Sequence, residues 1–552
     1  MEVNYNAIHV NGWRFSIMAI TAILSLPIMV VLVHVFLPAG EIWDHLLETV
    51  LFDYIRNSLL LMLGVAFGTV IGGVGCAWLA SMCDFAGRRW FEWALLLPMA
   101  LPAYIIAYTY TGLLDYAGTL QTFLRDMIGG HIWFPDIRSL GGAIIMMSLV
   151  LYPYVYLLTR AAFLNQSICV LDVSRTLGNG PWRTFFTLAL PLARPAIVAG
   201  LTLALMESLA DYGTVQYFGV QTFTTGIFKA WYGLDSEVAA LQLSAVLMLF
   251  MLVLIVMEQI SRQKARFHHT SQYHQAIRRI HLKGIKAWLA VAFCTIPVLF
   301  GFVIPAVQLV WWSVLVADSQ LNQQFITLLW HSMALALTAA FLSVLLALAL
   351  GYGQRLHPFK WIKGAVKIAG MGYAIPGTVI AVGIIIPLAW IDNRLDGFMR
   401  THFNLSTGLW LSGTLVALIF AYMVRFLAVS LQAVNSGLNQ IKPTLDEAGR
   451  TLGHSPIALV KRIHAPLLKA SLLTALLLVF VDVLKELPAT LILRPFNYNT
   501  LAVRAYEMAS DERLAQAGPA ALAIVAAGII PVIMLNRLIT KTRISHEKGT
   551  IG

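Results

Sequence analysis

Residues 172–196 read DVSRTLGNGPWRTFFTLALPLARPA, and residues 447–471 read EAGRTLGHSPIALVKRIHAPLLKAS. The two stretches align without a gap at an offset of 275, and each lies between long apolar runs. A short polar segment repeated in this way predicts a membrane protein that binds something two-fold symmetric at one membrane face. Seven of the 25 aligned positions are identical: Arg175/Arg450, Thr176/Thr451, Leu177/Leu452, Gly178/Gly453, Pro181/Pro456, Pro191/Pro466 and Leu192/Leu467.

Each copy predicts a helix-turn-helix elbow that lies along the membrane surface. An acidic residue suits the positive end of the first short helix, a glycine ends that helix, and a proline can begin the second. We expect the elbows at about residues 165–191 and 438–466. The residues that play these three parts are Asp172, Gly178 and Pro181 in the first copy, and Glu447, Gly453 and Pro456 in the second.

Twelve apolar stretches are long enough to cross a bilayer. Hydrophobic residues make up 59% of the chain and charged residues only 12%, which is too apolar for a soluble globular protein. A spanning helix needs about 20 mostly apolar residues. The first stretch is too long for a cleaved signal peptide, so we expect a retained helix. The stretches lie near 16–38, 58–81, 92–112, 140–162, 192–214, 238–258, 287–314, 331–353, 366–390, 408–430, 468–493 and 517–536.

The repeat extends over the whole chain and predicts two tandem halves. Pro102 matches Pro376 at an offset of 274, and Thr225 matches Thr500 at an offset of 275. An even number of spans gives both halves the same orientation, so their pseudo-two-fold axis should run along the membrane normal. We therefore predict an all-α integral membrane protein with about 12 transmembrane helices. Its parts are a first half (1–258), a basic linker (259–286) and a second half (287–552).

The distribution of charge predicts that both termini lie in the cytoplasm. With the N-terminus inside, 28 of the 38 Lys and Arg residues fall on cytoplasmic segments or inner span ends. The net charge of +11 is therefore explained by topology and does not indicate nucleic acid as a partner. The histidine-rich linker could bind metal, but a solvated basic segment that fixes topology is favoured.

The chain carries no motif for an enzyme or a resident cofactor. No G-x-x-x-x-G-K-[ST] phosphate loop occurs, so the chain is not expected to bind ATP by that route. The four cysteines show no C-x-x-C spacing, which argues against a disulfide framework or a zinc site. We expect a transport subunit without catalytic residues and without a stable metal site.

The elbow resembles the EAA motif of the permease subunits of bacterial ATP-binding-cassette (ABC) importers. The first copy has Asp172-Val173-Ser174, Gly178 and Pro191, and the second has Glu447-Ala448-Gly449, Gly453 and Pro466. The resemblance covers essentially the whole chain and implies a fused double permease. It assigns the elbow to docking on the ATP-hydrolysing subunit, with Asp172, Arg175, Gly178, Pro181, Glu447, Arg450, Gly453 and Pro456 as coupling residues.

A second resemblance concerns the substrate. The stretches 210–231 and 482–515 resemble the corresponding parts of ferric-iron importer permeases; thiamine, phosphonate and polyamine permeases share the architecture and stay open as alternatives. The resemblance implies a multi-pass protein of the bacterial inner membrane. Its partners would be two ABC ATPase subunits, which would bind ATP and Mg, and a periplasmic iron-binding protein. A secondary transporter driven by an ion gradient is the other reading, but such transporters need no repeated elbow.

Intramembrane carboxylates form a candidate translocation path. Two carboxylates four residues apart share one helix face, and charges within a span face the bundle interior or water. The alternative is that these residues cap helix ends or pair with Lys485 and with backbone groups. The candidates are Glu207 and Asp211 in the first half, and Asp482, Lys485 and Glu486 in the second.

Overall fold

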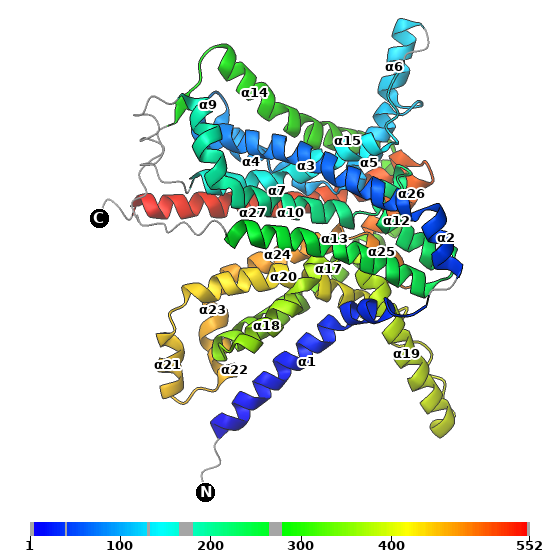
Figure 1. The fold of residues 1–552 in the computed structure, drawn as a ribbon, viewed down its shortest axis with the longest axis vertical. Helices are drawn as coiled ribbons and strands as arrows, with labels where there is room; N and C mark the ends of the chain where they lie inside the picture. The colour runs from blue at the N-terminus through cyan, green and yellow to red at the C-terminus, as the bar shows by residue number, and fades with distance from the viewer. Residues whose placement is uncertain (1–4, 39–40, 130–132, 165–179, 264–278, 549–552) are drawn as a thin grey trace. The chain divides into compact units, whose positions relative to one another are not determined.

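The computed structural model describes residues 5–38, 41–129, 133–164, 180–263 and 279–548, and these residues are almost entirely helical (Figure 1). In this part of the chain, ten helices are long and apolar enough to cross a membrane. Two bent helix pairs raise the number to 12 if each pair is one span. The expected all-α membrane fold is confirmed. The third expected span is not one straight helix, because it breaks by 91° between Ala100 and Ala103.

The first half contributes the following elements: α1 (Tyr5–His34), α2 (Glu41–Thr49), α3 (Leu51–Met82), β1 (Cys83–Asp84), α4 (Arg88–Ala94), η1 (Leu97–Ala100), α5 (Ala103–Leu114), α6 (Thr119–Ile128), α7 (Leu140–Leu164), α9 (Pro181–Thr184), η2 (Phe185–Ala189), α10 (Leu190–Ala210), α11 (Gly213–Tyr217), α12 (Phe223–Phe228), η3 (Lys229–Gly233) and α13 (Glu237–Gln263).

The rest of the chain contributes β2 (Ile280–His281), α14 (Ile285–Val298), η4 (Leu299–Val303), α15 (Ile304–Leu315), α16 (Ala317–Gln320), α17 (Gln323–Leu356), α18 (Lys360–Ala369), η5 (Gly370–Ala374), α19 (Gly377–Phe403), α20 (Leu415–Gln440), α21 (Thr444–Thr451), α22 (Pro456–Leu459), η6 (Val460–His464), α23 (Ala465–Leu467), α24 (Lys469–Leu484), α25 (Pro488–Leu493), α26 (Leu501–Ser510) and α27 (Leu514–Lys548).

The sequence repeat is also a repeat of elements. The ends of α3 and α17 are related by the same offset as Pro102 and Pro376, and so are the starts of α5 and α19. The π-helical turns η2 and η6 follow the short helices α9 and α22 directly, and their starts are related by the offset of the two elbows. The offsets that relate the two sequence halves therefore also relate their helices.

The described residues form two compact units that interleave the sequence halves. Unit 1 contains Met1–Trp43, Ile227–Ala245 and Leu321–Arg504. Unit 2 contains Asp44–Gly226, Val246–Gln320 and Ala505–Gly552. Each unit therefore has a central group of helices from one half, to which the other half adds further helices. The compact units are thus different objects from the tandem halves 1–258 and 287–552.

In unit 2, α3 packs along α7 at close range. A methyl group added at Gly64 would lie 2.6 Å from the Ile144 side chain, and one at Gly68 would collide with the Ser148 hydroxyl. Small residues at these positions allow two membrane helices to approach closely. The parallel pairing of β1 with β2 holds the end of the linker beside the residues that follow α3.

In unit 1, α17 packs against α20 and α24, and α1 crosses α18 and α19. Gly383 faces the backbone of α1, because an added methyl group would lie 2.7 Å from the Pro27 carbonyl oxygen. Helix α1 thus packs on helices of the second sequence half. This crossing explains why the compact units do not follow the chain order.

Candidate functional site

The elbow of the second half has the predicted helix-turn-helix form. Helix α21 ends at Thr451, and Gly453, two residues later, is left-handed with a φ of +79°. The Gly453 amide donates to the Arg450 carbonyl (2.9 Å) and the His454 amide to the Gly449 carbonyl (3.1 Å). These two bonds form a Schellman C-cap. Helix α22 then begins at Pro456, as predicted.

A buried carboxylate ties this elbow to the rest of unit 1. Asp446, in the first turn of α21, is only 7% exposed. Its Oδ2 accepts from Arg355 Nε at 2.7 Å, and its Oδ1 is hydrogen-bonded to His464 Nε2. Because Arg355 lies in α17 and His464 in η6, Asp446 joins three elements. The cluster Arg355–Asp446–His464 is called the elbow anchor below.

The same arginine also holds the backbone in front of the elbow. Arg355 Nη2 donates to the Ile441 carbonyl at 2.8 Å, and Nη1 donates to the Leu438 carbonyl. The elbow packs closely on its inner side, because a methyl group at Gly449 would collide with Leu459 of α22. The anchor and this packing together fix the angle between α21 and α22.

The environment of the anchor is positive. His357, directly after α17, is buried, and burial together with Arg14 and Arg450 lowers the pKa of its imidazole. The outer face of the elbow differs: Leu452 is 77% exposed and Ile457 is 55% exposed. Such an exposed apolar tip is suited to insertion into a partner's groove.

The structure separates the predicted coupling residues of the second elbow by role. Glu447 and Arg450 are exposed on α21, whereas Gly453 and Pro456 shape the turn. In the first elbow, Asp172, Arg175 and Gly178 lie outside the described residues. Pro181 begins α9, as its copy in the other half begins α22.

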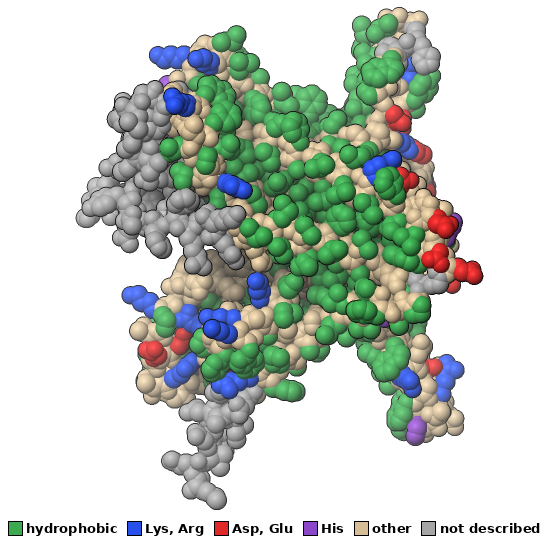
Figure 2. Space-filling view, viewed as in Figure 1, with side chains coloured by type: hydrophobic (Ala, Val, Ile, Leu, Met, Phe, Trp, Pro, Cys, Tyr) green, Lys and Arg blue, Asp and Glu red, His purple; other side chains and the backbone are tan. Residues whose placement is uncertain are grey.

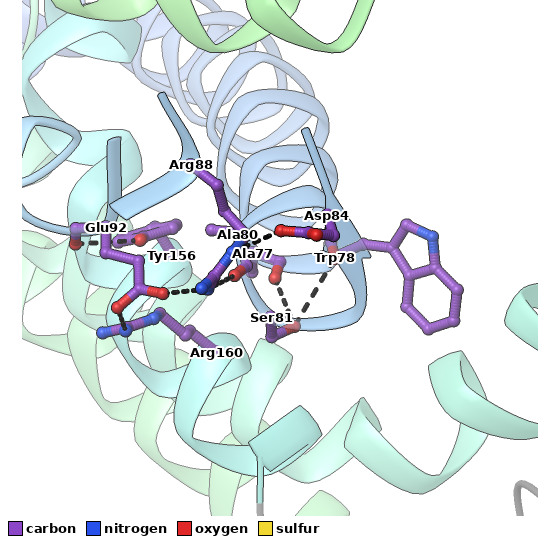
Figure 3. Close-up of polar contacts among 9 residues, drawn as sticks. All are labelled: Ala77, Trp78, Ala80, Ser81, Asp84, Arg88, Glu92, Tyr156 and Arg160. Carbon is purple, nitrogen blue, oxygen red and sulfur yellow. Dashed lines mark hydrogen bonds and ion pairs between the residues drawn. The ribbon is translucent and has the colours of Figure 1, made fainter. Parts of the chain in front are cut away.

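Unit 2 carries a different buried charge cluster, which joins α4 to α7 (Figure 3). Glu92 of α4 binds Arg160 of α7, with 2.8 Å between Oε2 and Nη2, and its Oε1 pairs with Arg88. Arg88 and Arg160 are 7% and 5% exposed. Tyr156 donates from its hydroxyl to the Glu92 carbonyl at 3.1 Å. This cluster, called the Glu92 network, fixes the end of α7 that leads toward the first elbow.

Sequence comparison of the two halves could not find either cluster. The positions that correspond to Arg355, Asp446 and His464 hold Ser81, Leu171 and Ala189. Figure 3 shows that the Ser81 hydroxyl bonds back to carbonyl groups of its own helix. A search for shared residues passes over positions where only one half is charged. The signal in the sequence that could have found the two clusters is the presence of charged residues within apolar segments.

In unit 2, the carboxylate of Asp211 caps a helix. Its Oδ1 accepts from the Thr214 amide at 2.8 Å, and its Oδ2 accepts from the Thr214 hydroxyl at 3.1 Å. Asp211 follows the last residue of α10 and thereby shapes the turn into α11. Glu207, one turn earlier on α10, is partly buried.

In unit 1, the corresponding residues also bind partners. Glu486 is 5% exposed, accepts from the Ala489 amide at 3.1 Å and pairs with Arg425 of α20 at 3.3 Å. Asp482 pairs with Lys485 at 2.8 Å. The bonds of Asp211, Asp482 and Glu486 match the capping and pairing alternative stated from the sequence. Among the residues described, no group of three or more His, Cys, Asp or Glu side chains could hold a metal ion.

Comparison with known proteins gives matches over both halves. Residues 69–267 match the family model described as "Binding-protein-dependent transport system inner membrane component". The chain is 26% identical over 532 residues to the Fe(3+)-transport system permease protein FbpB 2 of Haemophilus influenzae, covering 93% of this chain and 96% of that protein. It is 24% identical over 468 residues to the ferric transport system permease protein FbpB of Actinobacillus pleuropneumoniae, covering 80% and 64% of the two chains.

A shorter relative matches a single half. The molybdenum transport system permease protein ModB of Escherichia coli is 30% identical over 171 residues, which cover 31% of this chain and 71% of that protein.

Proposed function

The chain belongs to the family of binding-protein-dependent transport system inner membrane components, the permeases of ABC importers, and we propose that it carries ferric iron. The observation that supports iron is the extent of the match. A ferric permease aligns with 93% of the chain, through both halves, whereas the molybdenum permease aligns with 31%. The fused two-half organisation is thus shared with a relative whose name specifies iron.

The proposed partners follow from the elbows and the family. An ABC importer permease works with an ATPase and a periplasmic binding protein. We propose that two ATPase subunits bind, one at each elbow, and that they alone hold ATP and Mg. This chain then needs no cofactor of its own. Both termini and both elbows would face the cytoplasm, as the positive-inside bias favours.

The proposed coupling step is mechanical. Closure of the ATPase dimer on ATP would push the elbow tips, and the elbow anchor would transmit that movement to α17. Leu452 and Ile457 are the exposed contacts in the second elbow, and Asp446 positions them from inside. In the first elbow, Asp172, Arg175, Gly178 and Pro181 are proposed to act alike by sequence correspondence.

That these carboxylates line the ion path is also a proposal. Their positions on the helices decide which of them can be replaced without disturbing the fold. Asp211 and Glu486 accept backbone amides beyond the ends of α10 and α24, so their replacement would also disturb helix caps. Glu207 and Asp482 are better targets, because each lies within its helix and is partly buried. Each carboxylate would present negative charge to a passing ferric ion from its own unit, Asp482 with Lys485 beside it.

The experiment is uptake into proteoliposomes that contain the chain, its ATPase and its binding protein. Labelled ferric iron should enter only with ATP, and molybdate or sulfate should not compete. ATP-dependent uptake of an oxyanion without iron uptake would overturn the assignment of ferric iron as the substrate. Uptake driven by a proton or sodium gradient alone would overturn the ABC mechanism. Glu207→Gln with Asp482→Asn should reduce iron uptake with normal ATPase binding; unchanged uptake would remove these carboxylates from the path.

A further inference from the structure

Helix α6 exposes its apolar face, the reverse of a helix on the surface of a water-soluble protein. Leu120, Phe123 and Met127 share one face, since they are three and four residues apart. Phe123 is 58% exposed and Met127 is 69% exposed, whereas Gln121 on the opposite side is 9% exposed. In water a helix buries its apolar face and exposes the polar one.

Three polar residues of α6, Gln121, Thr122 and Arg125, bond to one another, whereas Asp126 is exposed. Arg125 donates from Nη1 to Gln121 Oε1 at 3.0 Å and from Nη2 to the Thr122 hydroxyl at 3.2 Å. Its guanidinium also lies 4.0 Å from the centre of the Tyr116 ring. The polar groups of Gln121, Thr122 and Arg125 therefore find partners within this segment. The outward apolar face is left to its surroundings, and Figure 2 shows hydrophobic side chains over this helix.

The location of α6 identifies those surroundings. The helix lies between α5 and the spanning helix α7, so both of its ends are held close to the membrane. Within unit 2 it runs crosswise to α3 and α7, and it lies at the end of the unit opposite α9 (Figure 1). The exposure of its apolar face is similar to that of the outward residues of spanning helix α3, such as Leu63 (68%) and Phe67 (72%).

The corresponding connection in unit 1 repeats the reversal with unrelated residues. Asp392, on the last turns of α19, is 1% exposed and accepts from the Ser412 amide and hydroxyl at 2.7 Å. Asp396, one turn later, accepts from the Thr407 amide at 2.8 Å. On the outside, Trp390 is 61% exposed and Phe398 is 52% exposed. Buried carboxylates again bind the loop that follows α19, and aromatic residues are exposed on the outside.

We propose that α6 and the end of α19 are interfacial anchors that lie in the headgroup region of the bilayer, on the side opposite the elbows. An amphipathic helix with aromatic residues on its apolar face lies in that plane with its apolar side toward the acyl chains. Tryptophan and tyrosine are enriched at this depth. Each anchor follows a spanning segment and would fix the height of its unit in the membrane while the elbows move.

The test measures the surroundings of single side chains. The four native cysteines are replaced by alanine, and a nitroxide label is attached through Phe123→Cys or, as the matched control on the polar side, Asp126→Cys. The full chain is placed in nanodiscs of phosphatidylethanolamine and phosphatidylglycerol. Relaxation by oxygen reports the apolar phase, and relaxation by a soluble nickel chelate reports water.

The interfacial position of α6 predicts that the label at position 123 relaxes several-fold more with oxygen than with the nickel chelate. At position 126 the ratio of oxygen relaxation to nickel relaxation should be reversed. Met127→Cys serves if Phe123→Cys does not fold, and Phe398→Cys against Asn393→Cys repeats the test in unit 1. Equal access to the chelate at both positions would place α6 in water and overturn the proposal. Protection from both reagents, with or without the binding protein, would mean a protein partner and would overturn it as well.

Discussion

The two units place their buried charge clusters at different positions relative to their elbows. In unit 1, the elbow anchor binds the elbow itself, because Asp446 lies in α21 and is held by Arg355 and His464. In unit 2, the Glu92 network binds the helix before the elbow, through Arg160 near the end of α7. The comparison shows that a repeat can keep backbone geometry and still change the residues that hold it. The halves are therefore expected to respond unequally to equivalent substitutions.

The largest effect is expected in unit 2. Glu92→Gln removes the carboxylate between two buried arginines, although Arg88 keeps Asp84 at 3.4 Å. Removing one partner of a buried ion pair costs about 3–5 kcal/mol, because the remaining charge is uncompensated. We expect a much lower thermal unfolding midpoint of the purified chain in detergent. The control is Glu48→Gln on α2, which is exposed. An unchanged midpoint for Glu92→Gln would show that the network does not stabilise unit 2.

The second effect separates elbow position from global stability. Asp446→Asn keeps the shape but weakens the charged bonds to Arg355 and His464, each bond of this kind contributing about 1.5–3 kcal/mol. We expect weaker association with the ATPase and lower transport, while membrane insertion stays normal. Co-purification with the ATPase and ATP-dependent uptake measure this. Glu447→Gln is the matched control, because the neighbouring carboxylate is exposed. A larger loss with Glu447→Gln would assign docking to the outer carboxylate and not to the anchor.

The sequence predicted what repeats and could not predict what differs. The spans, the start of α9 at Pro181 and of α22 at Pro456, and the turn at Gly453 follow from apolar length and from the preferences of proline and glycine. These signals are local. The partners of Asp446 come from positions 91 residues before it and 18 residues after it, so no spacing rule connects them.

The break of the third span and the interleaving of the units were equally out of reach of the sequence. Hydropathy measures how apolar a segment is, but not whether its axis turns, and 92–112 is apolar on both sides of the break. The crossing of α1 over α18 and α19 depends on tertiary packing. Among the carboxylates, the sequence left capping and an ion path open as alternatives; the structure places Glu207 on α10 and Asp211 directly after it, where Asp211 caps α11.

The smallest effect tests the part of the elbow that both halves share. At Gly453, φ is +79° and nothing lies within 4 Å of an added methyl group, so a substitution is opposed by the backbone conformation alone. A non-glycine residue in the left-handed region costs roughly 1 kcal/mol, asparagine less than alanine, and a β-branched residue more. We therefore expect ATPase association to fall least with Gly453→Asn, more with Gly453→Ala and most with Gly453→Val.

Insertion into the membrane should be unaffected in all three variants. Gly178 stands at the same position of the repeat, and the same series there should weaken association in the same order. If the three side chains act alike at Gly453, steric contact with the ATPase and not turn geometry limits docking. If only the Gly453 series has an effect, the first elbow does not share the left-handed turn, and the difference between the halves extends to the elbow backbone.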